Sequence, residues 1–190
     1  IILILLICVV SYRLIINSDY IQLKCVVSTI DGEKYCVRER KKVNAAVDRL
    51  AKVNKNMILV VKYCAENYGN QENVRRLKKG FNPKRITETL PTSTLTAYSE
   101  NKGEKIAFCL NKNKEDNNNL IDLNTLTFVA LHELAHVATK SVGHTPEFWN
   151  NFKFLLVQAK KINIYNPVDY SKEPNDYCGM TINHNPYYDK

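Results

Sequence analysis

The 190-residue sequence lacks several patterns that define common classes of small protein. Its six cysteines form no C-x-x-C pair, which argues against a zinc ribbon or a redox-active dithiol. It has no N-x-Ser or N-x-Thr sequence, as expected for a domain that is not exported through the secretory pathway. No internal repeat is present either. We therefore expect reduced, mostly buried cysteines in a cytosolic setting.

Histidine is scarce, with four in the chain, yet two of them stand in the motif H-E-L-A-H at residues 132–136. On an α-helix, positions i and i+4 lie on nearly the same face, so His132 and His136 can bind one metal ion. Glu133 lies about 100° around the helix and can reach a water on that metal as its general base. Zinc suits such a site because it acidifies a bound water. The alternative is a helix that carries these residues by chance.

Periodicity and helix-end signals place the motif in the first of two consecutive helices. The apolar spacing predicts a helix from near Thr125 through Lys140. Gly143 can take the left-handed conformation that closes a helix. Thr145 followed by Pro146 predicts the start of a second helix, with a hydroxyl N-cap and proline at the first helical position.

His144 falls in the tight corner between the two predicted helices, where it can fold back toward His132 and His136. Zinc sites need at least a third protein donor, so we predict His144 as the third ligand. An exposed polar residue in a turn is the alternative. Four other side chains are reserve candidates for this position: Glu147, Glu173, Asp176 and His184.

The pattern H-E-L-A-H, seven residues, His144 and then TPEFW resembles the small zincin peptidases of the SprT-like and WLM groups. The resemblance covers mainly residues 123–160. It implies an α+β, minimal zincin-like metallopeptidase domain with a small mixed sheet packed on the H-E-x-x-H helix. It also implies Zn²⁺ as cofactor and protein or peptide as substrate. The implied site is zinc on His132, His136 and His144, with Glu133 as the base.

Two features refine this resemblance. Thr139 and Val142 stand where a metzincin has glycine and histidine, so the chain does not resemble that group. Some SprT-like and WLM proteases cleave proteins crosslinked to DNA, which implies a possible nucleic-acid partner. Similar sequences are known chiefly from large DNA viruses, and this implies a viral origin.

The amino-terminal segment 1–16 carries a different signal. Ile1 to Val10 is wholly apolar, and Leu14 to Ile16 extends the run. A membrane-spanning helix needs about 20 apolar residues, so we expect a truncated anchor in a chain that does not begin with Met. Arg13 at its edge indicates that the domain at 20–190 faces the cytosol. A signal peptide or a buried core segment is the alternative.

The remaining elements follow from local patterns. Residues 21–29 and 33–38 predict a β-hairpin around Asp31-Gly32. Amphipathic spacing predicts a long helix at Val43–Tyr68, and a short basic helix is expected at 72–79, closed by Gly80. Strands are predicted at 86–90 and 105–110, and 111–119 is a polar loop. The strand at 105–110 is the candidate edge for pairing with an extended substrate, with an interior strand as the alternative.

The net charge of +8 comes largely from two basic runs, RERKK at 38–42 and RRLKK at 75–79. Such runs can make weak contacts with DNA or with anionic lipid at a membrane surface. The alternative is that both are solvated faces without a partner.

Three functions remain open on this reasoning. The first is a membrane-tethered zinc peptidase, in which Tyr177 or His184 is a possible stabiliser of the oxyanion. The second is a metal-dependent nuclease, which the basic charge would suit and for which Glu133 is not needed. The third is a non-catalytic zinc-binding adaptor at a membrane. Glu133 favours the peptidase, because that reaction needs a base beside the metal.

Overall fold

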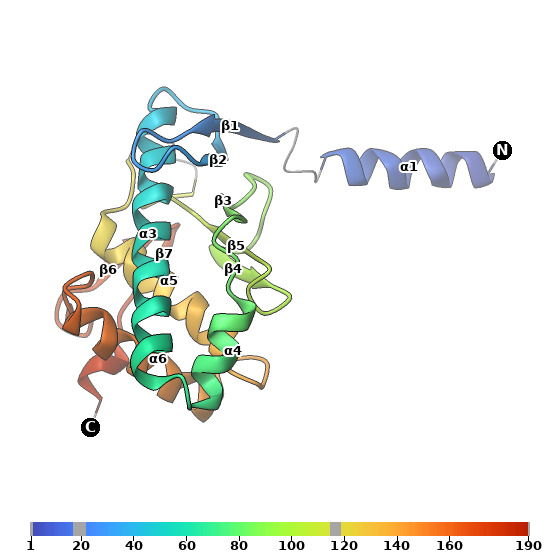
Figure 1. The fold of residues 1–190 in the computed structure, drawn as a ribbon. Helices are drawn as coiled ribbons and strands as arrows, with labels where there is room; N and C mark the ends of the chain where they lie inside the picture. The colour runs from blue at the N-terminus through green and yellow to red at the C-terminus, as the bar shows by residue number, and fades with distance from the viewer. Residues whose placement is uncertain (1, 17–21, 115–118, 190) are drawn as a thin grey trace.

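The computed structural model describes residues 2–16, 22–114 and 119–189, and these form an α+β fold with a mixed sheet (Figure 1). β1 (Leu23–Val27) and β2 (Lys34–Arg38) pair antiparallel. β3 (Ile86–Glu88) runs parallel to both β2 and β5 (Lys105–Phe108), and β4 (Ala97–Glu100) pairs antiparallel with β5. The predicted α+β class and mixed sheet are confirmed. The strands lie in the order β1, β2, β3, β5 and β4.

Four helices cover the sheet and carry the site: α3 (Val43–Tyr68), α4 (Glu72–Gly80), α5 (Leu123–Ala138) and α6 (Pro146–Lys161). The predicted bounds of α3 are confirmed. α5 begins after the N-cap Asp122, whose side chain accepts a hydrogen bond from the Thr125 amide at 2.8 Å. α6 begins after the predicted N-cap Thr145. The chain leaves α5 at Ala138, earlier than the predicted Lys140, because an extended segment begins at Thr139.

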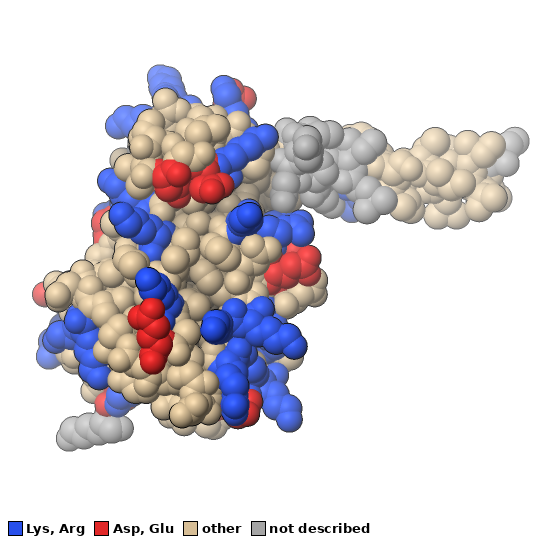
Figure 2. Space-filling model, viewed as in Figure 1, with Lys and Arg blue, Asp and Glu red and all other residues tan. Residues whose placement is uncertain are grey.

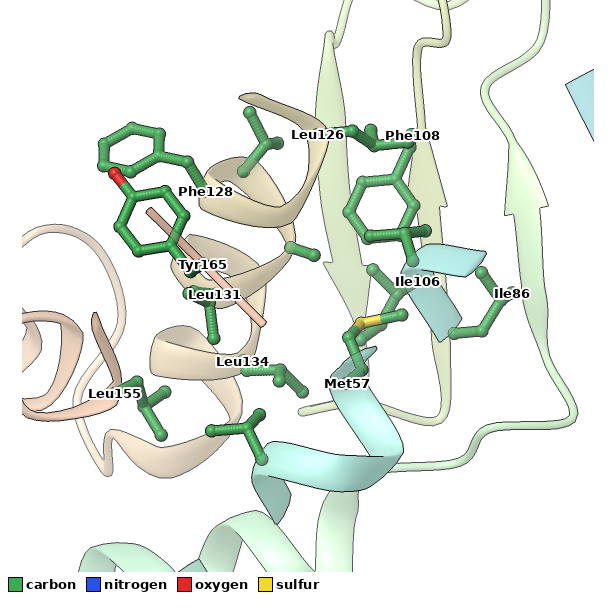
Figure 3. Packing of buried hydrophobic residues seen from close by; sticks show 14 of the residues in the cluster. Met57, Ile86, Ile106, Phe108, Leu126, Phe128, Leu131, Leu134, Leu155 and Tyr165 are labelled. Atoms are coloured by element: carbon green, nitrogen blue, oxygen red, sulfur yellow. The ribbon is translucent and has the colours of Figure 1, made fainter. Parts of the chain in front are cut away.

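The core lies between the sheet and the helices. Figure 3 shows Met57 of α3 between Leu134 of α5 and Ile106 of β5. These three side chains are at most 1% exposed. Burial of apolar surface is the main driving force of folding, so this packing fixes α5 against the sheet. α6 packs on the other side of α5, where Phe152 contacts Phe128 with ring centroids 5.1 Å apart.

A second, two-stranded sheet near the carboxyl end was not predicted. β6 (Asn175–Tyr177) and β7 (Met180–Ile182) pair antiparallel. Cys178 and Gly179 form the turn with φ of 51° and 80°, which fits the primed turns that match the twist of a hairpin. A short helical turn, η1 (Pro186–Tyr188), follows.

Disulfides join four of the cysteines, so the prediction of reduced thiols is wrong for these residues. The hairpin register places Cys25 opposite Cys36, and the two are bonded. The β6–β7 turn brings Cys178 to Cys109 at the end of β5, where the second disulfide forms. The second pairing could not be predicted from local sequence patterns, because it depends on the unpredicted hairpin.

The apolar amino-terminal segment forms α1 (Ile2–Ile16), which lies apart from the rest of the described chain (Figure 1). Among the described residues, no helix is both long enough and apolar enough to cross a membrane. α1 has 15 residues, whereas a span needs about 20. The prediction of a single membrane anchor at the amino terminus, and of a location that depends on it, is therefore contradicted.

The two basic runs have different environments. In the first run, Arg38 and Arg40 are buried and pair with Glu88 of β3, whose side chain is fully buried. In the second run, Arg75, Lys78 and Lys79 are exposed, and Figure 2 shows Lys and Arg gathered over α4. The two arginines of the first run are thus structural, whereas Lys41 and Lys42 are exposed. The predicted DNA and membrane contacts gain no support from this arrangement.

Candidate functional site

The candidate site is built on α5, which is buried along most of its length. His132 and His136 lie one turn apart on the face that α6 covers. The His132 ring contacts Phe148 and Phe152 with centroids 4.8 and 5.2 Å away. These aromatic contacts restrict the imidazole, so its orientation is set by the packing of the two helices.

Three imidazoles converge at this position. The Nε2 atom of His132 lies 3.2 Å from Nε2 of His136 and 3.1 Å from Nε2 of His144. The candidate ligand atoms of the three residues all lie within 4.8 Å of one another, a spacing at which they could hold a metal ion. The structure therefore brings together the histidines predicted from the sequence, and His144 reaches the pair from the loop between α5 and α6.

Burial keeps the imidazoles of α5 neutral. It lowers the pKa of His132 from 6.5 to about 3, with smaller effects from His136 and His144. Burial likewise lowers the pKa of His136 to about 4, assisted by His144 and by Lys102. A metal ligand must be deprotonated to offer its lone pair. The donor set therefore fits a divalent ion such as zinc at neutral pH.

Glu133 is the buried carboxylate beside the histidines. It is 4% exposed, and no described residue makes a hydrogen bond or ion pair with it. Burial raises its pKa to about 8. Buried polar groups normally have partners, and perturbed carboxylates in clefts are candidates for functional groups. Glu133 is thus a carboxyl group in the cleft whose pKa is raised by burial.

The histidines and Glu133 line an open cleft of about 730 Å³. One side is formed by β4 and the residues before it, from Leu95 to Ser99. β7 and the residues after it, from Met180 to His184, also line the cleft, and the Met180 sulfur accepts a hydrogen bond from the Thr96 hydroxyl at 3.6 Å. Aromatic side chains Phe128, Trp149 and Phe152 also contribute to the lining. A cleft of this size and depth is typical of sites that bind ligands.

The strand that borders the cleft differs from the predicted one. Of the two alternatives for residues 105–110, the exposed edge is wrong and the interior strand is confirmed, because β5 lies between β3 and β4. β4 is one of the two edge strands of the described sheet, with β1 at the other edge, and its Ala97, Tyr98 and Ser99 line the cleft. β5 carries the more apolar sequence, and the sheet buries it on both sides for that reason.

The other candidate residues lie outside the histidine cluster. Glu147 accepts hydrogen bonds from the loop that carries His144, and His184 pairs with Asp189 at 3.0 Å. Neither belongs to the group of side chains that could hold a metal, nor do Glu173 and Asp176, among the residues that the structure describes. Tyr177 is among the residues that line the cleft, and its hydroxyl donates to the Thr96 carbonyl at 3.2 Å.

Fold and site together define an α+β protein with a candidate three-histidine metal centre. No protein-family model matches the chain. The chain is 32% identical over 161 residues to Uncharacterized protein R325 of Acanthamoeba polyphaga mimivirus. That match covers 83% of this chain and 81% of the viral protein. The chain therefore belongs to the family of this mimivirus protein.

Shorter matches come from two other viruses. Uncharacterized protein 136R of Invertebrate iridescent virus 6 is 40% identical over 62 residues, and Uncharacterized protein 042R of Invertebrate iridescent virus 3 is 41% identical over 61 residues. The chain spans about a third of each, 35% and 36% respectively. These relatives support the predicted viral origin.

One solved structure also resembles the chain. The crystal structure of Wss1 from Saccharomyces cerevisiae aligns with a TM-score of 0.49 and 18% sequence identity. The alignment covers 65% of this chain and 84% of that chain. At that TM-score the likeness supports no conclusion about fold or function.

Proposed function

We propose that the chain is a zinc-dependent peptidase of the zincin type. The observation that carries the proposal is the convergence of three imidazole nitrogens beside a buried carboxylate in an open cleft. Three protein donors leave one position of a tetrahedral zinc ion open for chemistry. The resemblance of residues 132–149 to SprT-like and WLM zincins supports the same assignment.

His132, His136 and His144 are the proposed zinc ligands. When bound, zinc polarises the carbonyl of the scissile bond and lowers the pKa of water beside it. The aromatic rings of Phe148 and Phe152 hold the His132 imidazole in place, so the donor set is arranged before the ion arrives. Preorganisation of this kind reduces the free energy lost in ordering ligands.

Glu133 is the proposed general base and then general acid. Its carboxylate takes a proton from the attacking water and delivers that proton to the leaving amine. Without metal, burial raises the pKa of Glu133 to about 8, so its carboxyl group is largely protonated at neutral pH. A cation beside the carboxylate favours its charged form, so the pKa falls when metal binds, and Glu133 is then ready to accept a proton.

The proposed substrate is an extended peptide that pairs with β4. An edge strand offers backbone groups that bind a peptide main chain with little dependence on side chains. β4 has one partner among the described strands, β5, and its Ala97, Tyr98 and Ser99 line the cleft. The apolar side chains of Trp149 and Met180, which also line the cleft, would contact side chains of that peptide.

The proposal can be tested by metal analysis together with a cleavage assay on casein. We expect the purified chain to hold one zinc ion and to lose cleavage when a chelator removes it. Glu133→Gln should keep the zinc and lose cleavage, because the amide cannot take up the proton. Glu173→Gln, an exposed carboxylate outside the cleft lining, is the matched control and should cleave normally.

The metal ligands need a separate control. His144→Ala should lower the zinc content, whereas His184→Ala should retain it, because His184 lies outside the histidine cluster. RNA, used as a second substrate, tests the nuclease alternative. Cleavage of RNA but not of casein, surviving Glu133→Gln, would favour a nuclease, and full zinc with no cleavage of either substrate would favour the adaptor. Either result would refute the peptidase.

A further inference from the structure

We propose that Lys102 is a positioning residue for His144, an inference that rests on the metal site proposed above. Lys102 lies in the turn between β4 and β5. Its ammonium group donates to the carbonyls of His136, Thr139 and Ser141 at 3.3, 2.8 and 2.7 Å. A lysine ammonium has three donors, so these three carbonyls use its full hydrogen-bonding capacity.

These carbonyls lie at the point where the chain turns from α5 into the loop that carries His144. The last carbonyls of a helix have no partner within the helix, and a cation there is favourable. Lys102 supplies that cation from a different part of the chain, the edge of the sheet. It thereby joins the end of α5 to Ser141, three residues before His144.

The turn that presents Lys102 has an unusual backbone. Asn101, Lys102 and Gly103 have φ of 47°, 56° and 103°. A left-handed conformation is disfavoured for a lysine and persists where its surroundings hold it. Here the turn packs closely against α4 and α5. A Cβ on Gly103 would lie 2.7 Å from the carbonyl oxygen of Gly80 in α4 and 2.9 Å from a methyl group of Val137 in α5. This close packing fixes the origin of the Lys102 side chain.

Ser141 is a residue of the loop that forms hydrogen bonds through its carbonyl, its amide and its hydroxyl. Its carbonyl accepts from Lys102, its amide donates to Glu147 at 3.4 Å, and its hydroxyl lies 2.8 Å from the Thr145 hydroxyl. Val142, at 88% exposure, and Gly143, with open space around it, make little contact with the fold. The backbone at His144 is therefore held at the two ends of this short span, Ser141 and the N-cap Thr145, while the His144 ring contacts Phe148 with centroids 4.7 Å apart.

A second support explains why the loop should survive the loss of Lys102. Arg76 of α4 donates to the Ala138 carbonyl at 2.8 Å and forms an ion pair with Glu147 at 2.8 Å. Glu147 in turn accepts from the Lys140 amide at 3.2 Å. Figure 1 shows the loop after α5 beside α4. Without Lys102 we expect a folded loop in which Ser141, and with it His144, is less well placed.

The test compares Lys102→Met with Lys140→Met in the full chain. Lys140 is an exposed lysine of the same loop, and its ammonium has no hydrogen bond or ion pair with any described residue. Zinc affinity is measured by competition with a chromophoric chelator. We expect Lys102→Met to weaken zinc binding about 10- to 100-fold, the range found for residues that orient ligands. Lys140→Met should bind zinc as the wild type does.

The direction of the change in zinc affinity distinguishes a misplaced ligand from the loss of a positive charge. Removing a positive charge near a divalent cation would, by itself, strengthen binding of that cation. A weaker affinity in Lys102→Met therefore reports a misplaced ligand. An affinity equal to or tighter than that of the wild type would overturn the inference.

A double-mutant cycle shows whether Lys102 acts through His144. Once His144→Ala has removed the third ligand, adding Lys102→Met should change zinc affinity little. A full additional loss in that background would mean that Lys102 acts elsewhere, and the inference would be wrong. The unfolding temperature of each metal-free variant checks folding, and Lys102→Gln replaces Lys102→Met if the latter does not fold.

The same experiment distinguishes this inference from the proposed function. If His144→Ala binds zinc as tightly as the wild type, the metal site is wrong and the role of Lys102 falls with it. If His144→Ala weakens binding and Lys102→Met does not, only the role of Lys102 is refuted.

Discussion

Removal of the Cys109–Cys178 disulfide should destabilise the fold more than removal of Cys25–Cys36. The first closes a loop with a sequence separation of 69 residues and the second one of 11 residues. In the chain-entropy treatment, these loops correspond to about 4.4 and about 2.8 kcal/mol at 25 °C. We therefore expect the two variants to differ by about 1.6 kcal/mol in free energy of unfolding.

The environment of Cys178 makes the larger figure an upper limit. Its amide donates to the Asn111 carbonyl at 3.0 Å, and the Gly179 amide donates to the Lys112 carbonyl at 2.9 Å. These hydrogen bonds keep part of the turn in place without the disulfide. Because Tyr177 and Met180 flank the turn and line the cleft, its loss should also lower peptide cleavage. Neither Cys25 nor Cys36 lines the cleft, so that pair is the control.

The measurement is urea unfolding of two double variants, each with both cysteines of one pair changed to alanine. Alanine is preferred because Cys109 and Cys178 are 0% and 5% exposed, and a serine hydroxyl buried there would add its own cost. Equal losses, or a larger loss for the Cys25–Cys36 pair, would refute the argument from loop length. Alkylation of all six cysteines in unreduced, denatured protein would refute the disulfides themselves.

Three further predictions follow from buried charge and from the histidines. Glu88→Ala should cost about 3 to 5 kcal/mol in urea unfolding, because it leaves two buried guanidinium groups without their anion; a surface control, Glu66→Ala, should cost far less. The metal-free protein should lose stability in acid. The pKa values of His132 and His136 are about 3 and about 4 in the folded state, below the value of 6.5 in the unfolded state. The contribution of the two histidines to the free energy of unfolding is therefore full above pH 6.5 and decreases as the pH drops toward 4. An unfolding temperature that stays flat from pH 7 to pH 4 in chelator would contradict this. Zinc at about 100 times its dissociation constant should add about 2.7 kcal/mol of stability, and His144→Ala should reduce that gain at the same zinc concentration.

Local signals in the sequence were sufficient for the helices and for part of the site. The bounds of α3 follow from a long apolar stripe, and the start of α6 follows from Thr145 and Pro146. The convergence of His132 and His136 needs only helical spacing. His144 could be predicted because a short turn between two helices restricts the positions that its side chain can reach.

Contacts between distant parts of the chain could not be read in the same way. The second disulfide joins residues 69 positions apart, and its partner lies in a hairpin of three-residue strands whose sequence has little apolar alternation. The run at 38–42 predicts a basic surface, although Arg38 and Arg40 are buried and both pair with the single carboxylate of Glu88. No local sequence pattern indicates the proposed role of Lys102, because that role depends on carbonyls that lie about 35 residues further along the chain.

The choice of edge strand shows why function was harder to place than fold. β5 has the sequence KIAF and β4 has AYSE, so β5 gives the stronger strand signal. That strength comes from burial on both faces, which is the reason why β5 lies inside the sheet. A strand that borders an open cleft faces water along one edge, and polar residues are tolerated there. The strand best suited to bind a peptide is therefore the one with the weaker pattern, and a hydrophobicity argument will tend to select its neighbour.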